Sequence, residues 1–311
     1  MRIAVIGAGA MGSIYGGHLS QHNEVYLVDT AAPVVEHIQK EGLKLQENGE
    51  DILFNPMAVT STEGVGTVDL VILFVKALFS RAALSGNGGL IGPDTYVMTL
   101  QNGSGHEDIL GEFVDQDHII IGTTEDNGAV LGLGHIRRGG AGNTNVGMLT
   151  EDKNGFLPKL KEAFDCCGFN VKIHENIQQL IWDKLFTNVS LSAVTGILQV
   201  DMGYIAANEY AWAMTTSLIR EAVAVAKAMG LTADEEQIMA KVKKTSEMSP
   251  DGCTSIRADL RDGRRTEVDT ISGSVVRAAA KVGVPVPSHE FVVNMVCLLY
   301  TSDAADDSLR V

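Results

Sequence analysis

The chain has 311 residues, 45% of them hydrophobic, which is enough for two domains that each bury a core. Its 24 Lys and Arg side chains against 39 Asp and Glu give a net charge of −15, which argues against binding nucleic acid through phosphates. No apolar run approaches the roughly 20 residues that span a membrane and no signal-peptide pattern is present, so we expect a cytoplasmic protein without membrane contact.

The first twelve residues carry the most informative pattern in the chain. Residues 3–6 have the composition of a buried strand, and glycines follow at G-x-G-x-x-G spacing before a helix predicted over 13–20. In a Rossmann-type fold these glycines permit a tight turn, close approach of a pyrophosphate and close helix packing, while the helix N-terminus attracts phosphate. We therefore predict a dinucleotide site at Gly7, Gly9, Ala10, Met11 and Gly12.

A second predicted strand, residues 25–28, ends in Asp29. A carboxylate at the end of the second strand is typical of proteins that bind the ribose hydroxyls of NAD. An empty Rossmann-like pocket is the alternative interpretation of the same pattern.

The rest of the first half alternates strands and helices, which predicts a doubly wound parallel α/β sheet over residues 1–175. The predicted elements are a helix at 34–41, a central strand at 68–75, strands at 95–100 and 119–122, strands and tight turns at one edge of the sheet in the glycine-rich region 128–147, a helix at 156–167 and a strand at 170–173.

From about residue 176 the hydrophobic period becomes helical, which predicts an all-helical C-terminal domain over 176–300. The predicted helices are 177–198, 208–229 with Asn208 as N-cap, one opened by a capping box at 232–235, 266–281, and a final helix capped by Ser288. Residues 301–311 lack periodicity, and we expect them to be a non-native or disordered tail.

Polar residues form a stripe on the helix predicted at 177–198. Lys184, Asn188, Ser192 and Thr195 recur at steps of four, four and three, which puts them on one face of a helix without other charges between 185 and 200. A polar stripe on an apolar helix needs protein, water or ligand partners. We interpret it as facing a substrate; a solvated stripe with an extended Lys184 side chain is the alternative.

Two polar residues follow predicted strands, where α/β sheets bind ligands. Asn102 comes directly after the strand at 95–100, and Lys76 after the strand at 68–75. Asn102 can donate to a substrate oxygen, although an ordinary Asn-Gly turn explains it as well.

Two further candidates lie near the predicted helix at 266–281. Ser255 is able to bind a carboxylate, and Glu267 is expected in the first turn of that helix, where the helix dipole stabilises acidic groups. Neither the four cysteines nor the scattered histidines have metal-ligand or triad spacing, so we assign no metal site.

Together these motifs resemble the ketopantoate reductase (2-dehydropantoate 2-reductase) family across about residues 1–300. The matching pieces, in family order, are the glycine motif, Lys76, Gln101-Asn102-Gly103, Trp182-Asp183-Lys184-Leu185-Phe186-Thr187-Asn188, Ser255 and Arg265-Thr266-Glu267-Val268-Asp269.

The resemblance implies an NAD(P)H-dependent reductase of a 2-oxo acid, foremost 2-dehydropantoate to (R)-pantoate in pantothenate biosynthesis. It implies Lys184 as general acid, with Glu267 orienting Lys184 and the substrate. Substrate-binding roles are implied for Asn102, Asn188, Ser192 and Ser255, and cofactor-binding roles for Lys76 and Asn102. A homodimer is left open.

The chain departs from the family pattern at two places. Ser192 stands where the helix usually has a second asparagine, which weakens the expectation that the substrate is 2-dehydropantoate. Asp29-Thr30 stands where members that use NADP have an arginine. Because a carboxylate accepts from both ribose hydroxyls and repels a 2′-phosphate, we expect NADH in preference to NADPH.

Three alternatives remain. An NAD-dependent D-2-hydroxy-acid dehydrogenase of the D-mandelate dehydrogenase type would have the same fold and a different side-chain pocket. A non-catalytic dinucleotide sensor would not need Lys184 and Glu267. A flavoprotein also has a glycine turn followed by an acidic residue after the second strand.

Overall fold

The computed structural model describes residues 1–307, which divide into two compact units. The first comprises Met1–Gln101 and His106–Ile177, and the second comprises Asn102–Gly105 together with the chain from Gln178 on. The main division falls close to the boundary predicted at 175. The short loop 102–105 belongs to the helical unit although it follows a strand of the first, which the sequence did not indicate.

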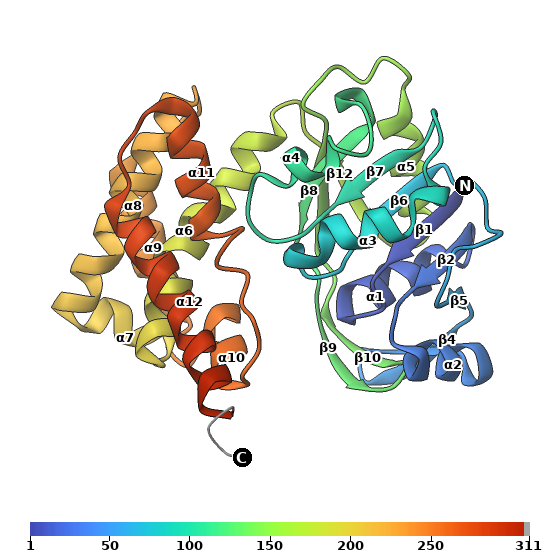
Figure 1. The fold of residues 1–311 in the computed structure, drawn as a ribbon, viewed down its shortest axis with the longest axis horizontal. Helices are drawn as coiled ribbons and strands as arrows, with labels where there is room; N and C mark the ends of the chain where they lie inside the picture. The colour runs from blue at the N-terminus through green and yellow to red at the C-terminus, as the bar shows by residue number, and fades with distance from the viewer. Residues whose placement is uncertain (308–311) are drawn as a thin grey trace. The chain divides into compact units, whose positions relative to one another are not determined.

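The first unit is built on an eight-stranded sheet with the order β12-β11-β8-β7-β6-β1-β2-β5 (Figure 1). Its strands are β1 (Arg2–Ile6), β2 (Glu24–Val28), β5 (Met57–Val59), β6 (Leu70–Leu73), β7 (Tyr96–Thr99), β8 (Ile119–Thr124), β11 (Asn143–Gly147) and β12 (Asn170–Ile173). Neighbours pair in parallel except β11 with β8. The predicted α/β fold with a mainly parallel sheet is confirmed, and the apolar β6 and β7 are buried throughout.

The helices of this unit are α1 (Ala10–Leu19), α2 (Ala32–Glu41), α3 (Ser80–Gly86), α4 (His106–Leu110) and α5 (Phe156–Asp165), with short 3-10 turns at η1 (Ala77–Phe79), η2 (Gly88–Leu90) and η3 (Gln116–His118). Helix α1 begins at Ala10, earlier than the predicted Ser13, because the glycine turn passes directly into the helix. Tyr15 from α1 and Phe164 from α5 are fully buried in the core between helices and sheet.

A second, four-stranded sheet was not predicted. Its order is β4-β3-β10-β9, with β3 (Leu43–Glu47), β4 (Glu50–Phe54), β9 (Asn127–Gly132) and β10 (His135–Gly140). The expectation that region 128–147 forms one edge of the main sheet is therefore wrong for β9 and β10, and correct only for β11. A side chain at Gly128 would lie 2.6 Å from the Ile14 side chain, so the missing Cβ lets β9 pack directly on α1.

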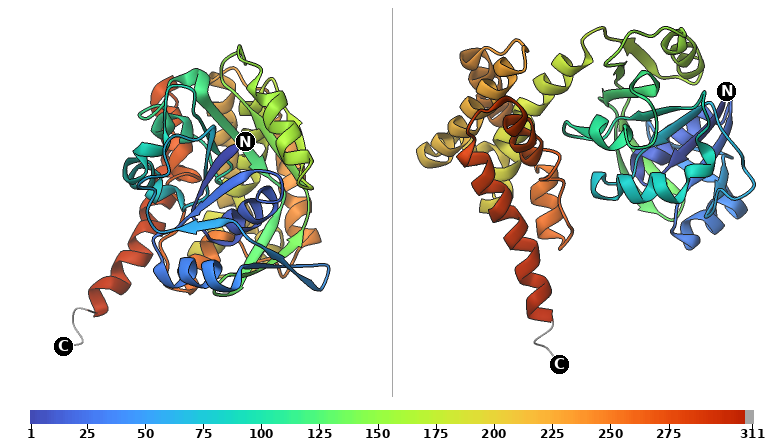
Figure 2. Two further views of the ribbon diagram at one scale, coloured as in Figure 1. Left: turned by 90° about the vertical axis from the view of Figure 1, so that its right-hand side faces the viewer. Right: turned by 45° about the horizontal axis from the view of Figure 1, so that its top comes forward.

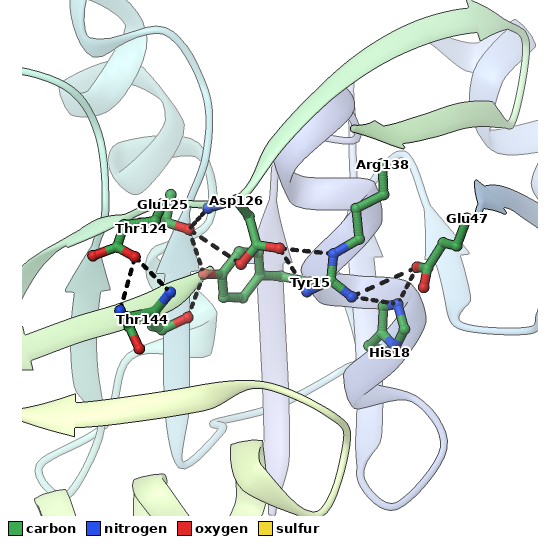
Figure 3. A network of polar contacts seen from close by, with 9 residues as sticks. Tyr15, His18, Glu47, Thr124, Glu125, Asp126, Arg138 and Thr144 are labelled. Carbon is green, nitrogen blue, oxygen red and sulfur yellow. Dashed lines mark hydrogen bonds and ion pairs between the residues drawn. The ribbon is translucent and has the colours of Figure 1, made fainter. Parts of the chain in front are cut away.

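A buried polar network links this second sheet to α1 (Figure 3). The Arg138 guanidinium on β10 binds the fully buried Asp126 carboxylate, with Nε 2.7 Å from Oδ1. Its Nη1 lies 3.2 Å from His18 Nε2 on α1, and that nitrogen lies 2.5 Å from Glu47 Oε1 on β3. One buried cation therefore joins two strands of the second sheet to α1.

Tyr15 continues the same network toward the main sheet (Figure 3). Its hydroxyl donates to Thr124 Oγ1 at 2.9 Å and lies 2.7 Å from Thr144 Oγ1. Burial raises the pKa of Tyr15, so the hydroxyl keeps its proton and stays a donor.

The second unit contains seven helices and no strand among its described residues. They are α6 (Ile177–Leu198), α7 (Met202–Ala207), α8 (Glu209–Ala228), α9 (Glu235–Met248), α10 (Ser255–Arg261), α11 (Ser272–Val282) and α12 (Pro287–Asp307). Trp182 and Phe186 of α6 pack in its core against the other helices. The predicted helical C-terminal region is confirmed.

Helix starts in this unit agree with the sequence at α8 and differ at α9. Asn208 caps α8 as predicted, because its side chain accepts from Tyr210 N and Ala211 N. Helix α9 is capped by Asp234, which accepts from Gln237 N, so the capping box at Thr232 is wrong.

Two more predicted starts are wrong. Helix α11 begins at Ser272, and residues 266–271 form a turn instead of its first helical turns. The start of α12 is capped by the Glu221 carboxylate from α8, which accepts from Ser288 N and His289 N. Ser288 therefore lies inside the helix and is not its N-cap. The capping carboxylate comes from a neighbouring helix, which the local sequence does not reveal.

Helix α12 is the long helix at the C-terminal end of the described chain (Figures 1 and 2). It continues to Asp307, where we expected no regular structure after 300. Residues 308–311 lie outside the described part, and the proposed non-native origin of the tail stays a prediction. Among residues 1–307, no helix has both the length and the apolar character needed to cross a bilayer.

The buried network generates a stability prediction. Replacing Arg138 with Met should lower the free energy of unfolding by about 3–5 kcal/mol, because the buried Asp126 carboxylate loses its cation. The neighbouring Arg137 is exposed, so Arg137→Met is the matched control and should change stability by less than about 0.5 kcal/mol. Urea unfolding measures both values, and equal losses for the two variants would contradict the assigned role of the network.

Candidate functional site

The glycine turn between β1 and α1 can be built only with glycine at two positions. Gly7 has a φ of +106°, and its N–H donates to Val28 O at 2.7 Å, which joins the turn to β2. A Cβ on Gly12 would lie 1.7 Å from Gly7 O. The helix therefore approaches the turn more closely than any side chain allows.

Gly9 differs, because the space beside it is open. A Cβ built on Gly9 would meet no atom within 4 Å, and its φ of −70° suits any residue. Gly9 is the N-cap residue of α1 and has no side chain to bond the first N–H groups of the helix. The following Ala10 and Met11 are partly exposed. An open surface at the unblocked N-terminus of a helix fits a dinucleotide pyrophosphate, so the residues present agree with the cofactor that the motif implies.

Asp29 lies directly after β2 and contacts the glycine turn. Its Oδ2 accepts from Ala8 N at 2.7 Å, and its Oδ1 accepts from Ala31 N at 2.9 Å. A carboxylate has about four acceptor positions, so both oxygens keep capacity for ribose hydroxyls. Asp29 therefore orders the turn, a role that the sequence did not indicate, and its expected contact with the ribose hydroxyls stays a prediction.

A pocket of about 420 Å³ lies beside Gly7 and Asp29, entirely within the first unit. Its lining residues are Ile6, Gly7, Val28, Asp29, Thr30, Thr60, Ser61, Val75, Phe79, Ala82, Ala83, Gly86 and Asn87. The set contains one carboxylate and no lysine or arginine. Apolar walls with few polar groups suit the adenosine part of a dinucleotide.

The sequence had not identified Thr60, Ser61 or Phe79 as lining residues. Thr60 and Ser61 follow β5, a strand of three residues that is too short for a recognisable period. A signal was available for the neighbouring hairpin, because Asn48-Gly49 with positive φ at both residues joins β3 to β4.

The second unit holds the polar stripe on a continuous α6. Lys184 and Asn188 are half-buried, and Ser192 and Thr195 are buried. Thr195 Oγ1 donates to Leu191 O at 2.8 Å and lies 2.8 Å from Thr254 Oγ1. The inner end of the stripe therefore has protein partners, which removes Thr195 from the residues that face a ligand.

Ser255 lies close to this end of the stripe. Its neighbour Thr254 caps α10, and a Cβ on Gly196 of α6 would lie 2.6 Å from the Ile256 side chain. The helices α6 and α10 thus approach closely there, and Ser255 itself is exposed at the first position of α10. The sequence did not predict α10 or its contact with α6.

The loop 102–105 brings Asn102 to the turn that contains Glu267. Ser104 N donates to Thr270 O at 3.0 Å, and a Cβ on Gly103 would lie 1.9 Å from that oxygen. The Glu267 carbonyl accepts from Thr270 N, so the turn is closed on itself. Glu267 is half-buried in this turn, five positions before α11, and the expected first-turn stabilisation by the helix dipole is wrong.

Lys76 lies in the first unit, half-buried in the loop between β6 and η1. Its carbonyl accepts from Phe79 N at 2.8 Å, which shapes the start of α3. The catalytic and binding roles given to these residues stay predictions. Among residues 1–307, no group of three or more His, Cys, Asp or Glu side chains is placed to hold a metal ion.

Two family models match the chain. The model described as Ketopantoate reductase PanE/ApbA matches residues 3–151, and the model of its C-terminal part matches residues 176–299. A 2-dehydropantoate 2-reductase from Lactococcus lactis is 32% identical over 302 residues, which cover 95% of this chain and 97% of the relative.

Solved structures with the same fold also match nearly the whole chain. A D-mandelate dehydrogenase with NADH and anilino(oxo)acetate matches with a TM-score of 0.87 and 32% identity over 97% of this chain and 99% of that one. A ketopantoate reductase from Ralstonia eutropha JMP134 matches with a TM-score of 0.87 and 27% identity over the same shares. With both family models covering most of its length, the chain belongs to the ketopantoate reductase family, whose members are NAD(P)H-dependent oxidoreductases that act on a CH–OH group.

Proposed function

We propose that this chain reduces the keto group of a 2-oxo acid with NADH, and that Lys184 supplies the proton. The observation that carries the proposal is the pocket beside the open glycine turn, which offers the Asp29 carboxylate and no cation among its lining residues. A 2′-phosphate placed there would meet a negative charge without a positive one. The neighbour with NADH in its structure supports the same preference.

The chemistry divides between the cofactor and the chain. The bound nicotinamide supplies a hydride to the keto carbon. The half-buried ammonium of Lys184 is proposed to donate a proton to the keto oxygen and to stabilise the negative charge that develops there. Glu267 is proposed to orient Lys184, while Asn102, Asn188 and Ser255 bind the substrate.

The first candidate substrate is 2-dehydropantoate, because relatives with that activity in their names match nearly the full length of the chain. A second candidate is another branched or aromatic 2-oxo acid, reduced to a D-2-hydroxy acid. It is favoured by the D-mandelate dehydrogenase neighbour and by the short, buried Ser192, which offers fewer donors than the asparagine of the family pattern.

Initial rates of NADH oxidation test the proposal. The purified protein is assayed with 2-dehydropantoate and with a panel of branched and aromatic 2-oxo acids, including phenylglyoxylate. The first candidate predicts the highest kcat/KM for 2-dehydropantoate, and the second predicts it for phenylglyoxylate or another panel member. Turnover of none of these acids with either nicotinamide would overturn the proposed activity.

Gly9 and Gly12 make a matched pair for the cofactor site. Gly9→Ala should leave thermal stability unchanged, because the added Cβ meets no atom, yet raise the Kd of NADH about tenfold or more by occupying the phosphate approach. Gly12→Ala should lower stability as well, because its Cβ meets Gly7 O. NADH affinity retained in folded Gly9→Ala would show that phosphate binds elsewhere.

Thr30 allows a test of cofactor choice that leaves the Asp29 contacts intact. Thr30→Arg puts a cation at the pocket and should raise the ratio of kcat/KM for NADPH over NADH about tenfold, the value of one charge-assisted hydrogen bond. Thr30→Gln has similar bulk without charge and should leave the ratio near that of the parent. A ratio unaffected by arginine would mean that the ribose lies away from Thr30.

Lys184→Ala should lower kcat by about 100- to 10,000-fold, the usual loss when a general acid is removed. The Kd of NADH should stay within about twofold, because the glycine turn is unchanged. Lys241→Ala is the matched control, since Lys241 lies exposed on α9 and its ammonium donates to the Asp183 carbonyl at 3.3 Å. Turnover of Lys184→Ala equal to that of Lys241→Ala would remove Lys184 from the chemistry.

A further inference from the structure

We propose that Gln101 is a positioning residue for the dinucleotide pocket. Its side chain determines where the backbone of Val75 and the start of α3 lie against the glycine turn. The inference rests on the proposed function, which puts NADH in that pocket, and it assigns to Gln101 a role that neither the motif nor the family match provides.

The Gln101 carboxamide joins three segments of the first unit. It is buried, with 8% of its surface exposed. Its Nε2 donates to Val75 O at 2.5 Å, just after β6, and lies 3.1 Å from Ser80 Oγ at the start of α3. Its Oε1 accepts from Thr99 Oγ1 at 2.8 Å, at the end of β7. One amide therefore ties the loop after β6 and the start of α3 to the end of β7.

Val75 is in contact with the glycine turn on its other side. A Cβ built on Gly7 would lie 2.8 Å from Val75 N and 2.9 Å from the carbonyl carbon of Phe74. Val75 therefore lies between Gly7 and Gln101, and it also lines the pocket. A shift of its carbonyl away from Gln101 would move the pocket wall and crowd or loosen the turn that binds the phosphates.

Ser80 extends the effect to a second lining residue. Phe79 lines the pocket and directly precedes Ser80, whose side chain is 2% exposed and contacts Gln101. Phe79 itself is 52% exposed. Phe79 ends the short turn η1. Gln101 contacts residues on both sides of this turn, namely Val75 before it and Ser80 after it.

An amide suits this position because the three contacts need both a donor and an acceptor. Val75 O requires a donor, and the Thr99 hydroxyl is paired as a donor to Oε1. Methionine has similar length and no hydrogen-bonding group, so Gln101→Met leaves these buried groups without their partner. Val75 and Ser80 are then no longer held by hydrogen bonds at a fixed distance from the end of β7.

Thr95 provides a control that separates positioning from stability. It lies just before β7, at the end of that strand opposite to Gln101, and is also buried, at 2% exposure. Its hydroxyl donates to Val68 O at 2.6 Å and accepts from Gly92 N at 2.9 Å, so it also links segments around the sheet. Thr95→Val removes these contacts and none of the residues involved lines the pocket.

The experiment compares the wild type, Gln101→Met, Ser80→Ala and Thr95→Val. Circular dichroism gives the unfolding midpoint of each, and fluorescence titration at a temperature where all are folded gives the Kd of NADH. Gln101→Met should raise Kd about tenfold, the equivalent of one lost well-placed contact, and Ser80→Ala should raise it less. Thr95→Val should lower the midpoint and leave Kd at the wild-type value.

The outcomes separate this inference from the proposed function. Wild-type protein that binds neither NADH nor NADPH overturns the proposed function, and the inference with it. If the wild type binds NADH and Gln101→Met binds it equally well, or if Thr95→Val weakens binding as much, the inference alone is overturned. Should Gln101→Met fail to fold, the Ser80→Ala titration decides, because an unchanged Kd there contradicts the role of the Gln101 contacts.

Discussion

The hydrogen bond from Ala8 N to the Asp29 carboxylate is the contact on which the candidate cofactor site depends. It joins the end of β2 to the glycine turn at 2.7 Å, while Gly7 N donates to the last residue of the same strand. These two bonds hold the turn in place. Helix α1 approaches the turn so closely that a Cβ on Gly12 would meet Gly7 O. The same carboxylate therefore orders the glycine turn and is the one charged group among the lining residues of the adjacent pocket.

The other groups of the first unit gather around the carboxyl ends of neighbouring parallel strands, where α/β sheets bind ligands. Gly7 follows β1, Asp29 follows β2, Lys76 follows β6 and Gln101 follows β7. In the helical unit, the candidate residues lie along one face of a helix. The inner end of the polar stripe on α6 is paired through Thr195 and Thr254, while Lys184 and Asn188, the residues proposed to act on the substrate, are half-buried.

Much of this could be predicted from the sequence, for identifiable reasons. Strands such as β6 and helices such as α6 carry strong hydrophobic patterns, and the glycine motif has one structural meaning when a strand precedes it. The second sheet was missed because its strands are polar or glycine-rich and pack on α1 through Gly128. The predicted start of α12 was wrong because its cap comes from Glu221, which is distant in the sequence. The linking role of Gln101 depends on Val75 and Ser80, which only the folded chain brings to it.

The most direct test of the central claim follows the hydride. NADH carrying deuterium at the transferable C4 position is incubated with the 2-oxo acid that gives the highest rate, and the 2-hydroxy acid formed is analysed by mass spectrometry and NMR. The account predicts a product with one deuterium on C2, formed in step with NADH oxidation. A product without deuterium at C2, or NADH bound in the pocket without turnover of any 2-oxo acid tested, would contradict it.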